Sequence, residues 1–334
     1  MKHTSLLLSC FLILFLASCG PAQERKGKKE AGEKGDLHLE QTDDYLRILH
    51  GDQPVLDYRI TSGLPADLPA HYERTGFFHP IYSPSGQVVT DDFPVGHTHQ
   101  HGFFTAWTNA TFLDSFVDFW NTHKGLAFVQ HEGITDIEER DGYLGFKAHL
   151  AHHSMAHDKR NRKNSWPVLF ETLTVRVHNR SAPFVWDIRS EQTNVTKDTL
   201  LLNKHLYGGL GIRGSKYWND SDSTHFRSPA KFLTSAGLSG DEANHTHPEW
   251  TIIYGDLPSG QAGLAIIPHP DNFRWPQAVR THPDMPYFSV SPVTEEGFFI
   301  APGETYLSRY RVVAFDGEVQ PAIINALGWD GLSD

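Results

Sequence analysis

The chain has 334 residues, a formal net charge of −11 at pH 7 and 21 histidines. Because it carries this negative charge and no basic cluster stands out in its folded part, we expect neither nucleic acid nor an anionic lipid surface as a ligand. The length exceeds that of a usual domain, yet all-β sandwiches reach about 200 to 250 residues as one unit, so one large domain is the expectation.

Residues 1–18 have the order of parts found in a bacterial lipoprotein signal peptide. A charged start is followed by an apolar run from Leu6 to Leu16, and small residues stand directly before Cys19. The run is too short for a membrane helix, which needs about 20 apolar residues. We therefore expect removal of residues 1–18 and acylation of Cys19, which would anchor an exported protein on the periplasmic or cell-surface side of a membrane. The alternative is an ordinary cleaved signal that happens to precede a cysteine.

The next two segments are a polar tether and the folded domain. Residues 19–36 are rich in Gly, Lys and Glu without apolar periodicity, which is typical of a solvated linker, and we expect residues 37–334 to form a single domain. The two cysteines of the chain are Cys10 and Cys19. Since the first leaves with the signal and the second takes the lipid, the domain has no thiol, which excludes disulfides, catalytic cysteines and cysteine-ligated metals.

Apolar and polar residues alternate with a period of two in several stretches of the domain, as expected for strands with one buried face. The clearest stretches are 144–150, 173–177, 184–191 and 305–315. Turns that contain Gly and Pro separate such stretches at short intervals, and the sequence has no long helical pattern. These features predict an all-β, mostly antiparallel fold that ends in a short helix within 321–329.

A histidine-rich stretch with several cations predicts a polar loop. His152, His153 and His157 stand next to four Lys or Arg residues within 159–163. We expect these side chains to be solvated, and we do not expect the stretch to form a functional site.

A second histidine motif is Gly-His-Thr-His-Gln-His-Gly at 96–102. If the stretch is extended, His97, His99 and His101 share one face, where neutral imidazoles are able to bind a divalent cation such as zinc and leave one position open. Alternatively, the same rings bind a substrate and move protons without a metal. The third interpretation is a polar strand face whose imidazoles bond to water or to the backbone.

A further cluster, within 203–213, combines a base, an ammonium, a phenol and a guanidinium. These groups belong to His205, Lys204, Tyr207 and Arg213, and the glycines between them let a ligand or another backbone come close. The mixture suits an anionic or heavily hydroxylated ligand. The alternative is a pair of strands kinked at glycine, with solvated charges.

Motifs spread over most of the domain resemble those of bacterial proteins grouped as a methane oxygenase PmoA family. They stand in the order of that family and are Phe78-His79-Pro80, Ser83-Pro84-Ser85-Gly86, Val89 to Pro94, His97 to Gly102, Val117 to Trp120, Gly208 to Arg213, Ile267 to Asn272 and Ala301 to Glu304. One departure is His101, where the family has arginine. Since a particulate methane oxygenase subunit is built from membrane helices, the family's label does not predict copper chemistry for a mature chain that has no apolar run long enough to span.

Three other motifs resemble galactose mutarotases and related sugar-binding β-supersandwich proteins. They are Thr193 to Thr196, Lys204 to Tyr207 and Pro302 to Tyr306. The resemblance implies a galactose mutarotase-like β-supersandwich, with His205 in the place of the general acid. A mutarotase also has a late glutamate as base, whereas the segment Tyr287 to Pro292 has no carboxylate. Ordinary mutarotation is therefore not expected.

These patterns together predict a carbohydrate-processing lipoprotein that moves a proton at a carbon of a sugar, or of a sugar-derived acid or ketone, as an epimerase or lyase does. His205 is the predicted acid or base, and Lys204, Arg213 or a cation held by His97 and His99 is the predicted electrophile for a developing oxyanion. The predicted substrate-binding residues are His79, Tyr207, His269, Arg280 and Trp120. The alternative is a carbohydrate-binding lipoprotein without catalysis.

Overall fold

The computed structural model describes residues 37–329. The predicted signal peptide, the lipidation site Cys19 and the tether lie outside the described residues. Strand pairs in the described part are antiparallel and the helices are short, which confirms the predicted all-β, mostly antiparallel class. No helix within residues 37–329 is long and apolar enough to cross a membrane.

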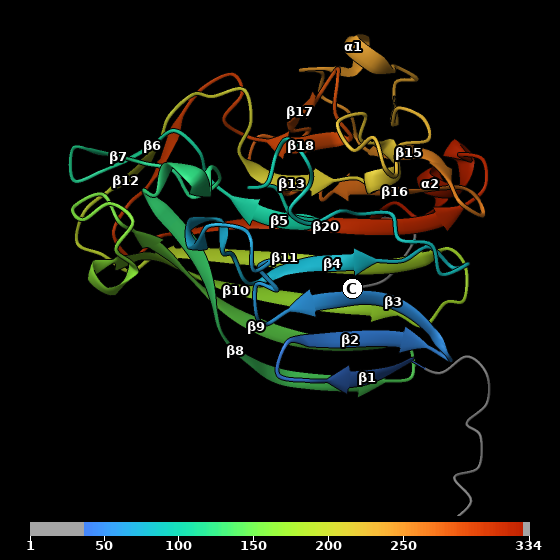
Figure 1. The fold of residues 1–334 in the computed structure, drawn as a ribbon, viewed down its shortest axis with the longest axis horizontal. Coiled ribbons are helices and arrows are strands. Elements are labelled where there is room, and N and C mark those ends of the chain that lie inside the picture. The colour runs from blue at the N-terminus through green and yellow to red at the C-terminus, as the bar shows by residue number, and fades with distance from the viewer. Residues whose placement is uncertain (1–36, 330–334) are drawn as a thin grey trace, which may run out of the picture. The chain divides into compact units, whose positions relative to one another are not determined.

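Eight strands form the first large sheet (Figure 1). In spatial order they are β1 (Leu37–Gln41), β2 (Tyr45–His50), β3 (Gln53–Arg59), β4 (Phe77–Ile81), β5 (Phe103–Ala106), β13 (Gly209–Arg213), β18 (Tyr287–Ser291) and β17 (Ala278–Thr281). The last three strands come from much later in the sequence than the first five. Their side of the sheet therefore brings together segments that are far apart along the chain.

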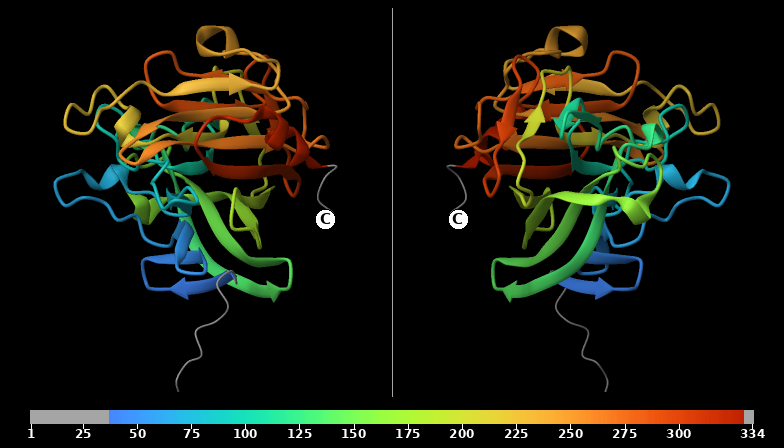
Figure 2. Two further views of the ribbon diagram at one scale, coloured as in Figure 1. Left: turned by 90° about the vertical axis from the view of Figure 1, so that its right-hand side faces the viewer. Right: turned by 90° about the vertical axis from the view of Figure 1, so that its left-hand side faces the viewer.

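Eight other strands form the second large sheet, which lies against the first (Figures 1 and 2). In spatial order they are β14 (Lys231–Thr234), β15 (Thr251–Leu257), β16 (Gly260–Pro268), β20 (Thr305–Asp316), β11 (Phe184–Asn194), β10 (Trp166–His178), β9 (Tyr143–Ser154) and β8 (Ala127–Arg140). The long strands β8 and β9 curve across the layer formed by the first three strands of the other sheet (Figure 2).

A third, smaller sheet and a few short helices complete the described part. The sheet contains β19 (Phe298–Ile300), β12 (Leu200–Leu202), β6 (Ala110–Phe112) and β7 (Ser115–Val117). The α-helices are α1 (Gly240–Ala243) and α2 (Pro321–Ala326), and the 3-10 helices are η1 (Ala70–Tyr72), η2 (Thr122–Lys124), η3 (Arg162–Asn164) and η4 (Lys216–Trp218).

The two large sheets face each other across one continuous apolar core. Strand β10 buries Leu173, Val175 and Val177 and exposes Arg176, as its alternation predicts. The same core cluster includes side chains of the first sheet such as Ile48. Because burying a Val, Leu or Ile side chain contributes about 1.5–3 kcal/mol, this shared core holds the two sheets together and gives the loops at their edges a fixed base.

The outer face of the second sheet is covered by α2, which confirms the short helix predicted within 321–329. Ile324 and Leu327 pack there in a second apolar cluster. Arg311 of β20 ties the end of this helix down, because its Nε and Nη2 donate to Asp187 at 2.7 and 3.0 Å while its Nη1 donates to the carbonyl of Leu327 at 3.1 Å. Apolar packing and the hydrogen bonds of Arg311 therefore hold α2 against this sheet.

The prediction of a polar loop is wrong for His152 and His153, which belong to β9. His152 is fully buried, and its Nε2 lies 2.7 Å from Oε2 of Glu171. The same carboxylate accepts hydrogen bonds from the hydroxyls of Thr105 at 3.1 Å and Ser190 at 2.6 Å. A carboxylate is stable in a core when it is paired in this way. The core thus contains a paired polar cluster, in which Nδ1 of His152 alone finds no partner among the described residues, and only the part of the stretch that follows β9 lies outside a strand.

Candidate functional site

A cavity of about 230 Å³ lies beside β17 and β18. Its walls come from four stretches that are far apart in the sequence: 97–100, 120–121, 206–207 and 280–287. We call it the histidine cavity, and the residues that line it are His97, His99, Gln100, Trp120, Asn121, Leu206, Tyr207, Arg280, His282, Met285 and Tyr287. Larger hollows exist in the described part of the chain, but this one collects five of the residues predicted from the sequence.

The stretch 96–102 is not a strand, so the premise of a three-histidine face is wrong. Two successive turns shape it, closed by hydrogen bonds that the amides of His97 (3.1 Å) and Gln100 (2.9 Å) donate to carbonyls three residues earlier. His97 and His99 nevertheless both line the cavity, with ring centroids 6.0 Å apart. The ring of His99 also lies 4.7 Å from that of His123.

His101 does not line the cavity and is fully buried. Its Nδ1 lies 2.6 Å from Oδ1 of Asp92, and its ring packs against Phe77 and Phe93 with centroid distances of 4.6 and 5.1 Å. The three imidazoles do not converge, because a turn, unlike a strand, does not place every second side chain on one face. Within residues 37–329, no group of three or more His, Cys, Asp or Glu is arranged to hold a metal ion.

Aromatic rings form one wall of the cavity. The ring centroids of Trp120 and Tyr207 are 5.2 Å apart, and those of Trp120 and Tyr287 are 6.0 Å apart. Trp120 reaches this position because Gly211 of β13 has no side chain, and a Cβ there would lie 2.4 Å from the indole ring. The wall therefore presents flat apolar ring faces, and the two tyrosines add polar hydroxyl groups.

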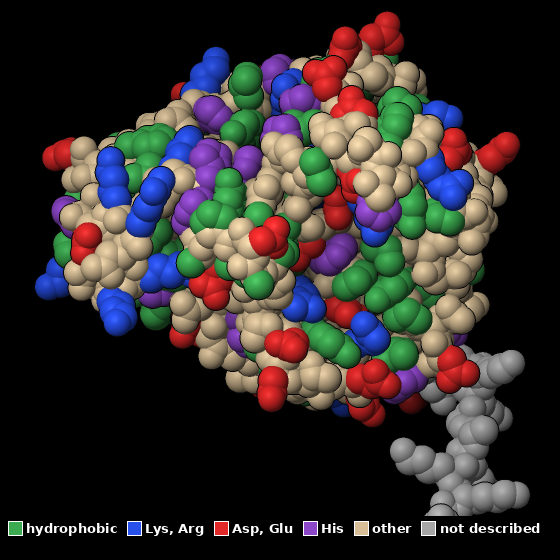
Figure 3. Space-filling view, viewed as in Figure 1, with side chains coloured by type: hydrophobic (Ala, Val, Ile, Leu, Met, Phe, Trp, Pro, Cys, Tyr) green, Lys and Arg blue, Asp and Glu red, His purple; other side chains and the backbone are tan. Residues whose placement is uncertain are grey.

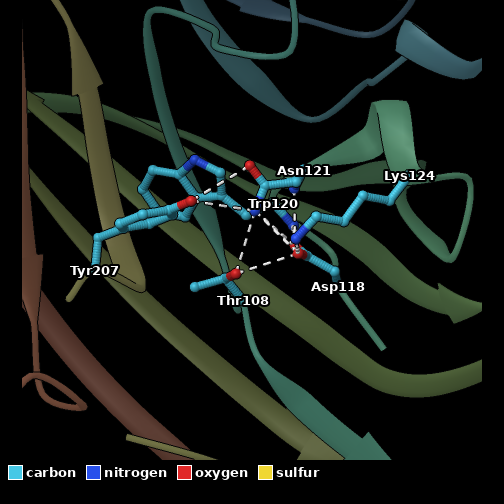
Figure 4. Close-up of polar contacts among 6 residues, drawn as sticks. All are labelled: Thr108, Asp118, Trp120, Asn121, Lys124 and Tyr207. Carbon is cyan, nitrogen blue, oxygen red and sulfur yellow. Dashed lines mark hydrogen bonds and ion pairs between the residues drawn. The ribbon is translucent and has the colours of Figure 1, made fainter. Parts of the chain in front are cut away.

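The hydroxyl of Tyr207 is tied to a buried polar network (Figure 4). It lies 3.3 Å from Nδ2 and 3.4 Å from Oδ1 of Asn121. Asn121 is held in turn by the buried carboxylate of Asp118, which accepts from Asn121 Nδ2 at 2.9 Å and lies 2.6 Å from Nζ of Lys124. Thr108 donates to the same carboxylate at 3.2 Å. The network orients Asn121 and, through it, the hydroxyl of Tyr207 at the cavity wall.

Two guanidinium groups lie in or directly behind the wall of the cavity. Arg280 lies on its wall, half-buried, and its guanidinium makes no hydrogen bond or ion pair with a described residue. Arg213 is buried, and its Nη1 donates to Oε1 of the lining residue Gln100 at 3.0 Å. Its Nε and Nη2 find no partner among the described residues. Burial lowers the pKa of Arg213 to about 10, against the effect of Asp91, so this group stays charged at pH 7. Since none of the lining residues is a carboxylate, the cavity favours an anion.

The imidazoles of the cavity are neutral at pH 7. Burial lowers the pKa of His99 to about 3, and the charges of His123 and His97 act in the same direction. Burial also lowers the pKa of His97, and it lowers the pKa of His282 together with the charge of Arg280. A neutral imidazole is able to accept a proton, whereas the nearby guanidinium groups act only as donors.

Two predicted catalytic residues, His205 and Lys204, do not line the cavity. The ring of His205 packs edge-on against Tyr207 with a centroid distance of 4.7 Å, and burial lowers the pKa of His205. Lys204 is exposed, and its carbonyl accepts a hydrogen bond from Nδ2 of Asn109 at 3.0 Å. The cluster predicted within 203–213 therefore contributes Tyr207 directly, Arg213 through its hydrogen bond to Gln100, and His205 through its contact with Tyr207.

Two predicted substrate-binding residues lie elsewhere. Nδ1 of His79 lies 2.9 Å from the hydroxyl of Thr90, and His79 is not among the lining residues. The ring of His269 packs against that of Trp329, 4.6 Å between centroids, at the end of β16 in the other large sheet. In contrast, the predicted Trp120, Tyr207 and Arg280 all line the cavity.

Six lining residues were missed by the sequence analysis. They are Gln100, Asn121, Leu206, His282, Met285 and Tyr287. Two of them had a usable signal, because Asn121 directly follows Trp120 and His282 stands two positions after Arg280. The others belong to loops and to a strand whose place in space follows from the topology of the sheet.

The fold and the cavity define an all-β antiparallel protein with a site lined by histidine, arginine and aromatic residues. The chain belongs to the family of unknown function DUF6807, whose model matches residues 45–328. A comparison with curated proteins found no match.

Several solved structures are similar to this chain at low sequence identity. Heparan sulfate lyase HepC from Pedobacter heparinus is 10% identical with a TM-score of 0.36, over 86% of this chain and 36% of the lyase. The α-galactosidase from Lactobacillus brevis is 10% identical with a TM-score of 0.34, over 84% and 39%. A putative mutarotase (YeaD) from Salmonella typhimurium is 11% identical with a TM-score of 0.30, over 84% and 94%. The chain thus spans little more than a third of the lyase and the galactosidase, and similarities at this level do not assign a function to it.

Proposed function

We propose that the histidine cavity binds a sugar-derived acid and transfers a proton at the carbon next to its carboxylate, as an epimerase or lyase does. The observation that carries this proposal is the composition of the cavity. It combines neutral imidazoles, a guanidinium without a protein partner and an aromatic wall, and none of its lining residues is a carboxylate. Such a set suits an anionic, hydroxylated ligand and a reaction that needs a base and a cation.

Binding would use the cation, the amides and the rings. Arg280 would pair with the carboxylate of the ligand, because a guanidinium matches a carboxylate through two parallel hydrogen bonds. The side-chain amides of Asn121 and Gln100 are available to sugar hydroxyls, and the face of Trp120 to the C–H side of the sugar ring.

The reaction would start when an imidazole takes the proton from the carbon next to the carboxylate. The electron pair of that C–H bond moves toward the carboxylate, and Arg280 stabilises the added negative charge. Return of a proton to the opposite face gives the epimer. Departure of an oxygen substituent from the neighbouring carbon instead gives a C=C bond, with the leaving oxygen protonated by a group such as the Tyr207 hydroxyl. We assign the base to His99, which burial and flanking imidazoles keep neutral in the free protein.

Two sequence predictions stay open within this proposal. His205 remains a candidate acid or base that would act next to Tyr207. A divalent cation on His97 and His99 remains a candidate electrophile, although these two residues supply fewer than the three protein ligands of a catalytic zinc site. The metal content of purified protein tests the second point.

The affinity of the protein for a sugar acid is expected to rise as the pH falls from 8 to 5. The pKa of His97 and that of His282 are lowered in the free protein, and a bound carboxylate would raise both pKa values, so binding takes up protons. The gain is up to about tenfold per pH unit for each proton taken up. Calorimetric titration with galacturonate and glucuronate, in buffers of different ionisation enthalpy, measures both affinity and proton uptake. Galactose, which has no carboxylate, is the control ligand, and equal affinity for galactose and galacturonate at every pH would rule out the proposed ligand class.

We also propose that the protein is exported and anchored through Cys19, which the signal-like sequence before it supports. Replacement of Cys19 by serine is then expected to abolish acylation, because the mature chain has no other thiol. Labelling of cells with a fatty-acid probe, followed by membrane fractionation, measures this. Uptake of the label by Cys19→Ser protein in the membrane fraction would contradict the anchor.

A further inference from the structure

A second hollow, of about 430 Å³, is lined by positively charged side chains. It lies between η1 and the segment that follows β9 and includes η3, and we call it the cationic groove. The charged and titratable residues that line it are His71, Glu73, Arg160, Arg162 and Lys163. Three of these cations belong to the basic stretch 159–163, so the expectation of no basic cluster in the folded part is wrong.

The cations of the groove exceed the carboxylates available to them. Arg162 is paired with Glu73, with Nη1 and Oε2 3.2 Å apart. The side chains of Arg160 and Lys163 have no ion pair or hydrogen bond with a described residue, and both are exposed. The carboxylate of Asp158 is engaged by the amides of two neighbouring asparagines. Two cations therefore face the groove without a protein counter-charge.

The groove and the histidine cavity are neighbours. Helix η1 contacts η2, and the amide of Arg160 donates to the carbonyl of Gly125 at the end of η2 at 3.0 Å. His71 in the groove is close enough to Arg160 and His123 for their charges, after burial, to lower its pKa. The ring of His123 lies 4.7 Å from that of His99, which lines the cavity. Imidazoles thus run from one site to the other, and Figure 3 shows Lys and Arg side chains gathered beside histidines on this face.

The volume of the histidine cavity limits the length of ligand that it is able to enclose. A volume of about 230 Å³ lies below the usual range of about 300–1,000 Å³ for sites that enclose a drug-sized ligand. A cavity of this volume fits about one sugar unit, so a longer ligand has to extend outside it. The groove is the adjoining hollow whose charge suits the same kind of ligand.

We propose that the cationic groove is a second subsite, which holds a carboxylate or sulfate group on a sugar unit close to the one in the histidine cavity. This inference rests on the proposed function and narrows its ligand to an anionic oligosaccharide. Arg160 and Lys163 would contact the second anionic group of the ligand. The imidazoles between the groove and the cavity would lie between its two anionic groups.

Titration calorimetry with galacturonate and tetragalacturonate tests the second subsite. Wild-type protein is expected to bind the tetramer about 10- to 150-fold more tightly than the monomer, which corresponds to one added charge-assisted contact. The double variant Arg160→Gln/Lys163→Gln is expected to lose this gain and to keep its affinity for galacturonate. The matched control Arg140→Gln/Lys197→Gln removes the same charge from exposed sites that line neither the cavity nor the groove and is expected to keep the gain.

The outcomes separate this inference from the proposed function. Equal affinity for monomer and tetramer, or a gain that survives in the double variant, would overturn the second subsite while leaving the cavity as a site for sugar acids. Galacturonate affinity that is unchanged by Arg280→Gln would instead overturn the cavity assignment. A chondroitin sulfate tetrasaccharide identifies the preferred anion: a larger gain than with tetragalacturonate assigns sulfate, and an equal or smaller gain assigns carboxylate.

Discussion

Replacement of His99 by glutamine is expected to slow proton transfer at a bound sugar acid by about 10²–10⁴-fold, the usual contribution of a positioned acid or base. Glutamine keeps a polar side chain of similar reach but does not take a proton near pH 7. Because His99 has no hydrogen bond to a described side chain, the melting temperature and the affinity for the sugar acid should change little.

The control for this variant is His38→Gln, which alters an exposed histidine of β1 that does not line the cavity. Rates and affinities are compared at one pH for wild type and both variants. If His99→Gln transfers protons at the wild-type rate, the base is another imidazole of the cavity, and His97→Gln and His282→Gln show which. If His99→Gln melts at a lower temperature than wild type but keeps the wild-type rate per folded molecule, the role of His99 is only structural.

Replacement of Asp118 by alanine is expected to lower the free energy of unfolding by about 1–3 kcal/mol, because it leaves buried hydrogen-bond donors without an acceptor. The side chain is fully buried, and its loss would leave Lys124, Thr108 and the amide of Asn121 without their shared acceptor. Urea unfolding measures the change. The affinity for a sugar acid should fall as well, since Asn121 no longer holds the hydroxyl of Tyr207.

An exposed ion pair of the same kind provides the control for Asp118. Asp136 and Lys147 lie 2.8 Å apart, but both are largely open to solvent, where such pairs contribute little. Asp136→Asn is therefore expected to unfold at nearly the wild-type urea concentration. Equal midpoints for Asp118→Ala and Asp136→Asn would show that the network of Figure 4 does not support the site.

The strands were predictable from the sequence because alternation is a local property. Leu173, Val175 and Val177 follow the period of a strand, and the structure buries all three. The histidine motif at 96–102 also has this period, yet turns interrupt it, so His101 enters the core while its neighbours stay at the cavity. Side chains at alternate positions indicate a strand only where the backbone is extended.

Parts of the site were predictable where several reactive groups stand close together in the sequence. The cluster around Tyr207 and the motif around His99 are of this kind, and both contribute to the cavity. The role of His152 was not predictable, because its partner Glu171 lies on the next strand and only the pairing of β9 with β10 brings them together. His282 joins the cavity for a similar reason, through the packing of β17 and β18 beside β13.

The proposed reaction of the histidine cavity is proton transfer at the carbon next to the carboxylate of a sugar acid. Incubation of purified protein with galacturonate, glucuronate and their oligosaccharides in D₂O, followed by NMR and mass spectrometry, tests it most directly. We predict deuterium at that carbon, or an unsaturated product, with wild-type protein, and a rate reduced by at least about tenfold with Arg280→Gln, which removes the cation that stabilises the added charge. Sugar acids that bind in the cavity but show neither deuterium nor an unsaturated product would contradict the claim and assign the protein to carbohydrate binding without catalysis.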